Sequence, residues 1–439
     1  MKFSNLPLSL TDMSAPVIGI ASRTQTPKGL RLHIGLFGRR NAGKSSLINA
    51  LTNQKIAIVS DVPGTTTDPV EKACELAPIG PVVFIDTAGV DDVGELGGLR
   101  TERSLAVLGW VDVALIVCDA KALAESELEL IRTVKSTATP TVVVLNKADT
   151  ADAKELIATQ EQVRSLGYEP VTVCASQKLN IDAVREAIVK LAQNAVEPDL
   201  PLLGDLVHPG DTVMLVTPID TGAPKGRMIL PQVQAIREVL DADAKCIVVR
   251  ENRLAETLTN EKEPPAFVVT DSQVVQSVVA QTPKTIPVTT FSIQMAYSKC
   301  DLVEMARGAA MIDFLHPGDK VMICETCSHH PQPDDIGRKK LPRWLAKKVG
   351  GELDIEVVVG KDFPVDLTPY KLILQCGGCV VTRRHMLTRL AQAKRQNIPM
   401  TNYGVAISHL QGVLERALEL HPKALKAFHE AREIFANHF

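Results

Sequence analysis

The sequence predicts an α/β fold with three parts: an N-terminal doubly wound parallel sheet of the phosphate-loop class, a middle α/β domain and a C-terminal α/β domain. Residues 38–45 read GRRNAGKS, a complete G-x-x-x-x-G-K-S loop, between an apolar run over Leu32–Phe37 and a helix-like run over 46–51. Strand-like and helix-like runs then alternate through residues 31–196. Such alternation is typical of a parallel sheet with helices on both faces.

The composition favours a soluble protein of several domains. The chain has 439 residues, of which 45% are hydrophobic and 23% are charged. No apolar run approaches the roughly 18 residues that span a bilayer. Residues 1–30 lack a long apolar core, so we expect a flexible arm instead of a signal peptide, and a cytoplasmic location. Because the net charge is −3, a large nucleic-acid footprint is not expected.

Apolar runs within residues 31–196 predict the strands of the first domain, and the segments between them predict its helices. The expected strands are Leu32–Phe37, Val82–Asp86, Val113–Asp119, Thr141–Asn146 and Pro170–Cys174. The expected helices include Ala122–Lys135 and Asp152–Ser165. A segment with two prolines, residues 196–201, is typical of a linker and ends this domain.

Two further domains are expected over residues 204–304 and 310–439. The first of them has apolar runs and one clear helical pattern, at Val213–Thr217, Cys246–Val249, Ala266–Thr270, Val288–Phe291 and Leu230–Leu240. The sequence His-Pro-Gly-Asp occurs at 208–211 and again at 316–319, each time before an apolar run. This likeness indicates similar domain beginnings, but four residues are weak grounds for a duplication.

The GRRNAGKS loop carries the groups needed to hold a triphosphate. Its two glycines let successive backbone N–H groups turn toward phosphate oxygens, and the helix that follows adds the positive end of its dipole. Lys44 can reach the β- and γ-phosphates, and the Ser45 hydroxyl can ligate Mg²⁺. The residues expected to contact the nucleotide here are Gly38, Asn41, Ala42, Gly43, Lys44, Ser45 and Ser46.

Two later segments complete the expected magnesium and γ-phosphate site. Asp86 ends an apolar strand and is followed by Thr-Ala-Gly, so its carboxylate can hold Mg²⁺ through water. The Gly89 N–H can then contact the γ-phosphate. Residues 63–68, with the sequence PGTTTD, are typical of a first switch loop, and Thr66 is the expected second Mg²⁺ ligand.

Other residues predict selection of guanine. Asn146, Lys147 and Asp149 belong to an Asn-Lys-Ala-Asp motif at the end of a strand. The Asp149 carboxylate can accept both N1–H and N2–H₂ of guanine, a donor pair that adenine lacks. The Ala175 N–H is expected to face the O6 atom of the base. The motifs together therefore predict a GTP-binding domain.

These motifs, over roughly residues 31–195, resemble the Era/TrmE-like branch of the translation-factor-class GTPases. Val90 stands where other GTPases place a water-orienting glutamine, so hydrolysis must use another device. Asn41 matches the asparagine that helps to hold K⁺ beside the phosphates in the related potassium-activated GTPases, and such a cation could supply the charge of an arginine finger. Cys174 replaces the usual serine; we expect little effect, because Ala175 makes the contact with the base.

Four of the nine cysteines form two C-x-x-C pairs in the last domain. Cys324 and Cys327 follow one apolar run, and Cys376 and Cys379 follow another. Because sites in open α/β sheets collect beyond the carboxyl ends of strands, the pairs can close on one metal. Two alternatives remain open from the residues: a zinc site with four thiolates, or a 4Fe–4S cluster held by Cys327, Cys376 and Cys379.

The pattern C-x-H…C-x-x-C, made by Cys327, His329, Cys376 and Cys379, resembles the signature of the FeFe-hydrogenase maturation GTPases (HydF). The resemblance covers the chain from about residue 20, since a GTPase domain, a middle domain and a cysteine domain follow in that family's order. It implies a 4Fe–4S cluster held by three cysteines, with His329 as the candidate for the exchangeable fourth position. Gln375 stands where many members have a second histidine, which leaves a ligand role there in doubt.

The family resemblance also implies a function. It implies a scaffold or carrier for the two-iron subcluster of FeFe-hydrogenase, which receives this cargo from radical-SAM maturases and delivers it to the apo-hydrogenase. It makes the middle domain a dimerisation module, so we expect a homodimer or a tetramer, with no nucleic-acid or membrane partner. A carrier needs an open iron position, so we expect that Cys324 is not a permanent ligand.

Three further expectations concern regulation and partners. GTP binding should order residues 63–68 and the segment after Gly89, and this switching should govern partner release and not iron chemistry. A basic run is either a solvated helix face or a docking surface for an acidic partner or an anionic two-iron unit; it comprises Arg338, Lys339, Lys340, Arg343, Lys347 and Lys348. The alternative function is a ribosome- or tRNA-associated GTPase with a structural zinc module.

Overall fold

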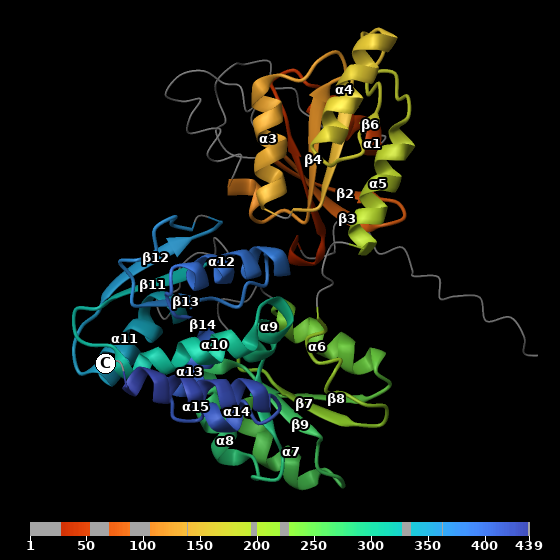
Figure 1. Cartoon of the computed structure of the whole chain (residues 1–439). Helices are drawn as coiled ribbons and strands as arrows, with labels where there is room; N and C mark the ends of the chain where they lie inside the picture. The colour runs from red at the N-terminus through yellow and green to blue at the C-terminus, as the bar shows by residue number, and fades with distance from the viewer. Residues whose placement is uncertain are drawn as a thin grey trace, which may run out of the picture.

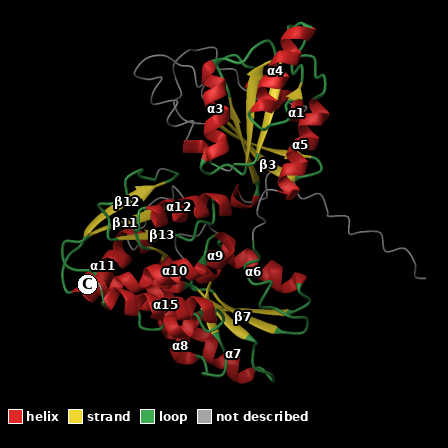
Figure 2. Cartoon of the chain, viewed as in Figure 1, coloured by secondary structure: helices red, strands yellow, loops and turns green. Residues whose placement is uncertain are grey.

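The computed structural model describes residues 28–52, 70–87, 106–137, 139–194, 200–219, 228–326, 335–361 and 363–437. Its strands form three separate sheets, and helices lie against each of them (Figure 1, Figure 2). The sheet of the N-terminal part stands at the top of Figure 1, and the other two sheets lie below it. The expected α/β class is confirmed.

The N-terminal sheet has six strands in the order β2-β3-β1-β4-β5-β6, and all neighbours are parallel except β2 and β3. The strands are β1 (Leu32–Phe37), β2 (Val70–Leu76), β3 (Gly80–Asp86), β4 (Val113–Asp119), β5 (Thr141–Asn146) and β6 (Val171–Thr172). One face packs on α1 (Lys44–Thr52) and α5 (Ile181–Asn194), and the other on α3 (Glu125–Ser136) and α4 (Ala153–Ser165). The sheet is therefore doubly wound, as predicted.

Two strands and one helix of the N-terminal part differ from the sequence-based expectation. Strand β2 was not expected, because it is a half-exposed edge strand and carries charged residues between its buried ones. Strand β6 has two residues only, because the chain turns at Cys174, which pairs with Leu179 in an isolated bridge. Helix α3 begins at Glu125 and not at residue 122, since the Glu127 carboxylate accepts the Ala124 N–H at 2.9 Å and caps the helix there.

The other two sheets share one topology. Each has four parallel strands, in the orders β8-β7-β9-β10 and β12-β11-β13-β14. In both, the second strand of the chain lies on one side of the first, and the third and fourth lie on the other. The strands are β7 (Thr212–Val216), β8 (Lys245–Val249), β9 (Phe267–Thr270), β10 (Val288–Thr290), β11 (Lys320–Glu325), β12 (Asp354–Val359), β13 (Leu372–Gln375) and β14 (Met400–Asn402).

The two His-Pro-Gly-Asp segments form the same turn at the start of each of these sheets. The aspartate carboxylate accepts the backbone N–H of the histidine, at 2.8 Å in 208–211 and at 2.7 Å in 316–319. The glycine has a φ of 87° in the first turn and 89° in the second. Because the turn and the strand order agree, the structure supports the duplication for which the four residues alone were weak grounds.

Two helices join the second and third sheets. Helix α9 (Phe291–Lys299) contributes Phe291 to the core of the second sheet and Ile293 to the core around β11 and β13. Helix α10 (Leu302–Ala309) packs on the latter core and on α15. The remaining α-helices of the described residues are α6 (Leu230–Asp241), α7 (Leu254–Asn260), α8 (Val275–Gln281), α11 (Leu341–Val349), α12 (Arg383–Arg395), α13 (Tyr403–Leu410), α14 (Leu414–Ala417) and α15 (Pro422–Ala436). Shared packing across residues 291–309 leaves the exact domain limits a prediction.

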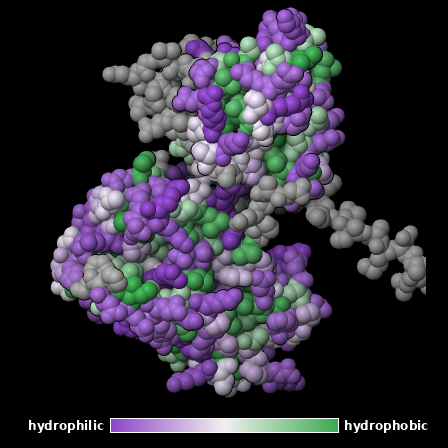
Figure 3. Space-filling model, viewed as in Figure 1, coloured by the Kyte–Doolittle hydropathy of each residue, from purple (hydrophilic) through white to green (hydrophobic). Residues whose placement is uncertain are grey.

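Hydrophilic side chains cover most of the molecular face seen in Figure 3, and hydrophobic ones form scattered patches. Among the described helices, none combines the length and the apolar character that crossing a bilayer requires.

Candidate nucleotide and metal sites

The phosphate loop between β1 and α1 is folded around two glycines. Gly38 has a φ of 144°, and a Cβ atom there would lie 2.1 Å from the Val117 carbonyl oxygen. Gly43 has a φ of 95°, and a Cβ atom there would lie 2.1 Å from Nδ2 of Asn146. Only glycine fits either position without moving β4 or the end of β5. The loop is thus held in place before any nucleotide binds.

Lys44 and Ser45, the residues predicted to contact phosphate and magnesium, both bind groups of neighbouring elements. Lys44 Nζ donates to the carbonyl oxygens of Gly38 and Arg39, at 2.9 Å each, so the ammonium closes the loop. The Ser45 hydroxyl donates to Oδ2 of Asp86 at 3.1 Å, which joins the first turn of α1 to the carboxyl end of β3. Asn41 is in the same loop, in the left-handed region with a φ of 60°.

Some groups predicted near the γ-phosphate belong to segments outside the described residues. Thr66 and Gly89 lie outside the described residues, as do Val90 and the switch segment over 63–68. Their roles stay predictions.

Asn146 connects the phosphate loop with the guanine loop. Its Nδ2 donates to the Ala42 carbonyl oxygen at 2.9 Å, and its Oδ1 accepts the Ala175 N–H at 3.0 Å. The side chain is buried, so both bonds are shielded from water. The Ala175 N–H, which was expected to face guanine, is therefore engaged by Asn146 and would have to be shared with the base.

The aspartate expected to read guanine is oriented by two residues that the sequence did not single out for this role. Cys174 Sγ donates to Oδ1 of Asp149 at 3.1 Å, and Gln177 Nε2 donates to Oδ2 at 3.2 Å. Lys147 Nζ lies 3.2 Å from Oδ2 of Asp119 at the end of β4. The one feature of the sequence that could have indicated this role is that Cys174 replaces the usual serine.

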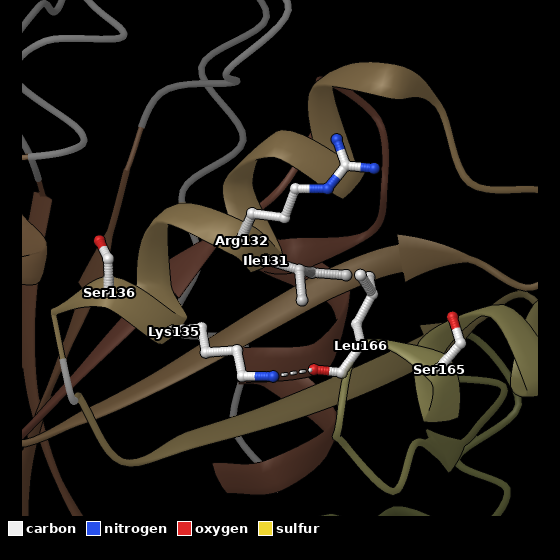
Figure 4. A pocket seen from close by; sticks show the side chains of 6 residues that line it. All are labelled: Ile131, Arg132, Lys135, Ser136, Ser165 and Leu166. Atoms are coloured by element: carbon white, nitrogen blue, oxygen red, sulfur yellow. Dashed lines mark hydrogen bonds between the residues drawn. The ribbon is translucent and has the colours of Figure 1, made fainter.

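Two of the surface hollows among the described residues lie in the nucleotide-binding part. The hollow behind the guanine loop has a volume of ≈ 220 Å³ and is lined by Ala148, Asp149, Thr172, Val173, Cys174, Leu179 and Asn180. The other, of ≈ 360 Å³, lies between α3 and α4 (Figure 4) and is lined by Ile131, Arg132, Lys135, Ser136, Ser165 and Leu166. Lys135 Nζ donates to the Leu166 carbonyl oxygen across it at 3.0 Å. It contains none of the predicted site residues.

Strand register in the third sheet brings the two cysteine segments together. Cys324 of β11 pairs with Gln375 of β13, and the Cys376 N–H donates to the Cys324 carbonyl oxygen at 2.9 Å. Strand β12 lies on one side of β11, and β13 lies on the other. The strand order therefore reverses between β11 and β13. The carboxyl ends of these two strands lie at the edge of the sheet where α/β proteins bind their ligands.

Cys376 directly follows β13 at this edge and is half-buried, and Cys379 is half-buried and packs against the core of the second sheet. The Thr326 N–H lies 3.2 Å from Cys376 Sγ, and the Thr326 hydroxyl lies 3.1 Å from it. Hydrogen bonds from neighbouring groups commonly support metal-bound sulfur, so the surroundings of Cys376 are compatible with a metal or cluster ligand. Cys327 and His329, the other expected ligands, lie outside the described residues. Within the described ones, no three His, Cys, Asp or Glu side chains gather as a metal site.

Cys324 is placed differently from the other cysteines of the two pairs. Its side chain has no exposed surface and packs in the core with Met322 and Ile373. Burial raises the pKa of the Cys324 thiol to about 12, so the thiol stays protonated at neutral pH. Because the thiolate is the metal-binding form, this environment disfavours a ligand role for Cys324.

Half of the basic run beside this edge is engaged within the protein. Three of its six members bind neighbours: Arg338 binds Glu325 at 2.8 Å, Lys340 binds Gln273 at 2.7 Å and Lys348 binds Asp313 at 2.7 Å. The other three, spaced four residues apart, are exposed: Lys339, Arg343 and Lys347. A docking role is therefore best tested on these three.

A cluster of aromatic and charged residues, here called the junction cluster, joins the N-terminal part to the third sheet. It consists of His33, Glu71, Trp110, Lys361 and His385. Lys361 Nζ lies 3.5 Å from the centre of the Trp110 ring and forms an ion pair with Glu71 of β2. His385 of α12 stacks on Trp110 with ring centres 6.0 Å apart, and His33 of β1 meets the same ring edge-on at 6.0 Å. Sequence patterns carried no sign of this cluster.

The junction cluster holds both histidines neutral. Burial, with help from the Lys361 charge, lowers the pKa of His33 to about 4. Burial and the Arg389 charge lower the pKa of His385 well below its usual range. Burial raises the pKa of Glu71, but hydrogen bonds from Lys28 and Lys361 outweigh it, so the Glu71 pKa lies below its usual value. Glu71 is therefore ionised next to two neutral imidazoles.

Three family models match different parts of the chain. Residues 303–420 match a model described as the hydrogen maturase F tetramerization domain, and residues 202–300 match the hydrogen maturase F dimerization domain. Residues 33–147 match a model described as a 50S ribosome-binding GTPase.

Curated relatives resemble a smaller share of the chain. The GTPase Der of Wolinella succinogenes is 35% identical over 172 residues, which cover 37% of this chain and 36% of that protein. The tRNA modification GTPase MnmE of Trichormus variabilis is 37% identical over 167 residues, which cover 37% of this chain and 34% of that protein. The chain thus spans about a third of the length of these relatives. The solved structure of Era from Aquifex aeolicus bound to GDP·AlF4⁻ is 20% identical with a TM-score of 0.33, covering 52% of this chain and 97% of that one.

Proposed function

Because this chain belongs to the hydrogen maturase F family, we propose that it is a GTP-hydrolysing scaffold that carries the two-iron subcluster of FeFe-hydrogenase and delivers it to the apo-hydrogenase. The observation that carries the proposal is the match of residues 202–300 and 303–420 to two domains of that family, behind a GTPase domain. The phosphate loop and the paired cysteine segments support its two halves.

In the nucleotide half, the described residues provide binding and orientation. Lys44 would neutralise the β- and γ-phosphates, and the Asp149 carboxylate would hold the guanine. Ser45 and Asp86, with Thr66, would hold Mg²⁺, which when bound supplies positive charge at the phosphates. Water would attack the γ-phosphorus and GDP would leave, giving GDP and phosphate. With a valine at position 90, K⁺ at Asn41 is the proposed source of the further charge that this step needs.

In the metal half, three thiolates would hold a 4Fe–4S cluster: those of Cys376 and Cys379 at the edge of the third sheet and that of Cys327. When bound, the cluster would supply an iron with an open coordination position for the cargo. His329 is the proposed exchangeable ligand at that position. The burial of Cys324 in the core supports three thiolates over four, because a fourth would have to leave the apolar packing around Met322.

The nucleotide state would control partner release. The switch segment over 63–68 lies just before β2, and β2 carries Glu71 of the junction cluster, which contacts Lys361 of the cysteine domain. Ordering of that segment could therefore reach the surface of the metal domain. We expect Lys44→Ala to bind GTP poorly and to slow partner dissociation; if dissociation and hydrogenase activation were both unchanged, the switching role would be wrong.

The proposed partners follow from the family. Radical-SAM maturases would supply the cargo and the apo-hydrogenase would accept it, and the dimerization and tetramerization domains support an oligomer. Charge reversal at the exposed Lys339, Arg343 and Lys347 tests whether the basic run docks either partner. Salt-dependent loss of hydrogenase activation is expected if it does.

An absorption spectrum of protein purified and reconstituted without oxygen tests the proposal. An iron–sulfur cluster gives a broad band near about 400 nm, with iron and sulfide in the sample. A colourless protein that binds zinc would instead favour the alternative, a ribosome- or tRNA-associated GTPase with a structural zinc module. The net charge of −3 already weighs against that alternative.

A further inference from the structure

The sulfur of Cys376 is surrounded by hydrogen-bond donors. Besides the Thr326 N–H at 3.2 Å and the Thr326 hydroxyl at 3.1 Å, the amide nitrogen Nε2 of Gln375 lies 3.5 Å from Sγ. A thiolate that ligates a metal carries no proton, so all three contacts must then be donated to the sulfur. Gln375 has no exposed surface, and water does not compete for its amide.

The Gln375 amide can present only its nitrogen to the sulfur. Arg389 Nη1 donates to Oε1 of Gln375 at 3.0 Å, and a guanidinium has donors but no acceptor. The oxygen must therefore face Arg389, which leaves Nε2 directed at Cys376 Sγ and at the carbonyl oxygens of Cys324 and Cys376. The orientation follows from chemistry and not from an arbitrary choice between the two amide atoms.

Arg389 is itself fixed from several sides. It lies on α12 and is 3% exposed, and its Nη2 donates to the Gly360 carbonyl oxygen at 2.9 Å. The centre of its guanidinium lies 5.0 Å from the centre of the Phe363 ring. The planar Arg389 guanidinium thus has one orientation, because it contacts β13, the end of β12 and an aromatic ring. The Gln375 amide is consequently held by a rigid neighbour.

We propose that Gln375, oriented by Arg389, is a positioning residue that directs an N–H group at the Cys376 thiolate and raises the reduction potential of the cluster held there. The inference rests on the proposed function, because it requires an iron–sulfur cluster at Cys376. Reduction adds an electron and makes the ligand sulfurs more negative. An N–H group aimed at such a sulfur stabilises the reduced form more than the oxidised form. Gln375 is not a ligand, since its oxygen is held by Arg389.

The test compares full-length wild type with Gln375→Met and Gln375→Glu after anaerobic reconstitution with iron and sulfide. Methionine fills a similar volume without a donor, and glutamate replaces the donor with a negative charge. The midpoint potential is measured by titration with dithionite, followed by electron paramagnetic resonance. We expect the midpoint potential of Gln375→Met to be lower than that of wild type by about 59 mV, which is a roughly tenfold smaller equilibrium constant for one-electron reduction. The midpoint potential of Gln375→Glu should be lower still.

Gln392→Met is the matched control. Gln392 is on the same helix as Arg389, but its amide binds the carbonyl oxygens of Pro364 and Val365, at 2.6 and 3.1 Å. The midpoint potential of the cluster in Gln392→Met should equal that of wild type. Arg389→Lys keeps the positive charge but loses the fork that orients Gln375, and we expect a smaller fall in the same direction.

Unchanged potentials and spectra in Gln375→Met and Arg389→Lys, at full iron content, would overturn the inference and leave the proposed function intact. If Gln375→Met bound no iron, Gln375→Glu and Arg389→Lys would decide, and equal potentials there would overturn it as well. Wild-type protein that takes up no iron would overturn both proposals.

Discussion

At the scale of single residues, the aspartate expected to read guanine is oriented by a cysteine whose sulfur was expected to matter little. Cys174 donates to one carboxylate oxygen of Asp149 at 3.1 Å, and Gln177 donates to the other at 3.2 Å. Both oxygens are therefore oriented before a base arrives. Preorganisation of this kind lowers the free-energy cost of ordering the carboxylate on binding.

We expect Cys174→Ala to weaken GTP binding about fivefold, because a lost hydrogen bond to the carboxylate costs about 1 kcal/mol. Cys174→Ser keeps a donor at the same place and should bind GTP as wild type does. Titration with a fluorescent GTP analogue measures all three affinities. Three equal values would show that the sulfur does not orient Asp149.

At the scale of elements, the turn after β13 determines where the second cysteine pair points. Gly378 has a φ of 67°, and a Cβ atom there would lie 2.8 Å from the sulfur of Met386 on α12. The nearest atom to a Cβ on Gly377 is 3.9 Å away, and its φ is not positive. Two adjacent glycines thus have different roles: Gly378 is required by the backbone, and Gly377 is not.

Gly378→Ala should lower stability by about 1–3 kcal/mol, since an alanine is forced into the left-handed region against Met386. It should also lower the iron content after reconstitution, because relief of the strain would move Cys379. Gly377→Ala is the matched control and should leave both unchanged. Urea unfolding and iron analysis measure the two effects, and equal results for the two variants would contradict this account of the turn.

At the scale of the whole molecule, the junction cluster connects the N-terminal part to the third sheet. Lys361 leaves the third sheet just after β12 and meets Glu71 and Trp110 of the first sheet. Two more contacts cross the same junction: Arg384 Nη2 donates to the Thr139 hydroxyl at 2.9 Å, and Lys299 Nζ donates to the Gly29 carbonyl oxygen at 2.7 Å. The junction therefore contains several specific polar contacts.

Replacing Lys361 should loosen this junction. Lys361→Met removes an ion pair and a cation–π contact, together worth on the order of 2 kcal/mol of docking free energy. Small-angle scattering should show a larger radius of gyration. Lys320→Met is the matched control, because Lys320 makes the same two kinds of contact within one sheet, with Glu356 at 2.8 Å and the Tyr370 ring at 5.1 Å. Equal radii for both variants would argue against docking through Lys361.

Stability should fall in acid because of the buried histidines. The pKa of His33 is about 4 in the folded protein and 6.5 in the unfolded chain, so the unfolded chain binds the proton first. The free energy of unfolding therefore declines as the pH falls from about 6.5 to about 4, by about 3 kcal/mol for this residue, and does not change above that window. Urea unfolding across the window measures the slope.

His33→Gln should remove the contribution of His33 to the pH dependence of the free energy of unfolding and leave the contributions of other groups. His421, which contacts Gln294 beside the second sheet, also has a pKa lowered by burial to about 4 and supplies an independent comparison. His421→Gln should remove a similar share, and the two effects should add because the residues belong to different cores. A slope unaffected by either change would show that other groups control acid unfolding.

The sequence alone determined the elements that depend on local pattern. The phosphate loop, the strands β1, β4 and β5 and the helix α6 were predicted closely, because glycine positions and apolar periodicity are properties of neighbouring residues. The edge strand β2 was missed for the same reason, since its charged residues interrupt the apolar pattern.

Only the tertiary structure decided which distant residues meet. Cys324 and Cys376 belong to similar motifs, but strand register places Cys324 in the core and Cys376 just beyond the carboxyl edge of the sheet. Trp110 and Lys361 are separated by most of the chain and carry no shared motif. A contact of that kind depends on how sheets and helices pack, and packing is set by the surfaces of whole elements, which no short segment of sequence contains.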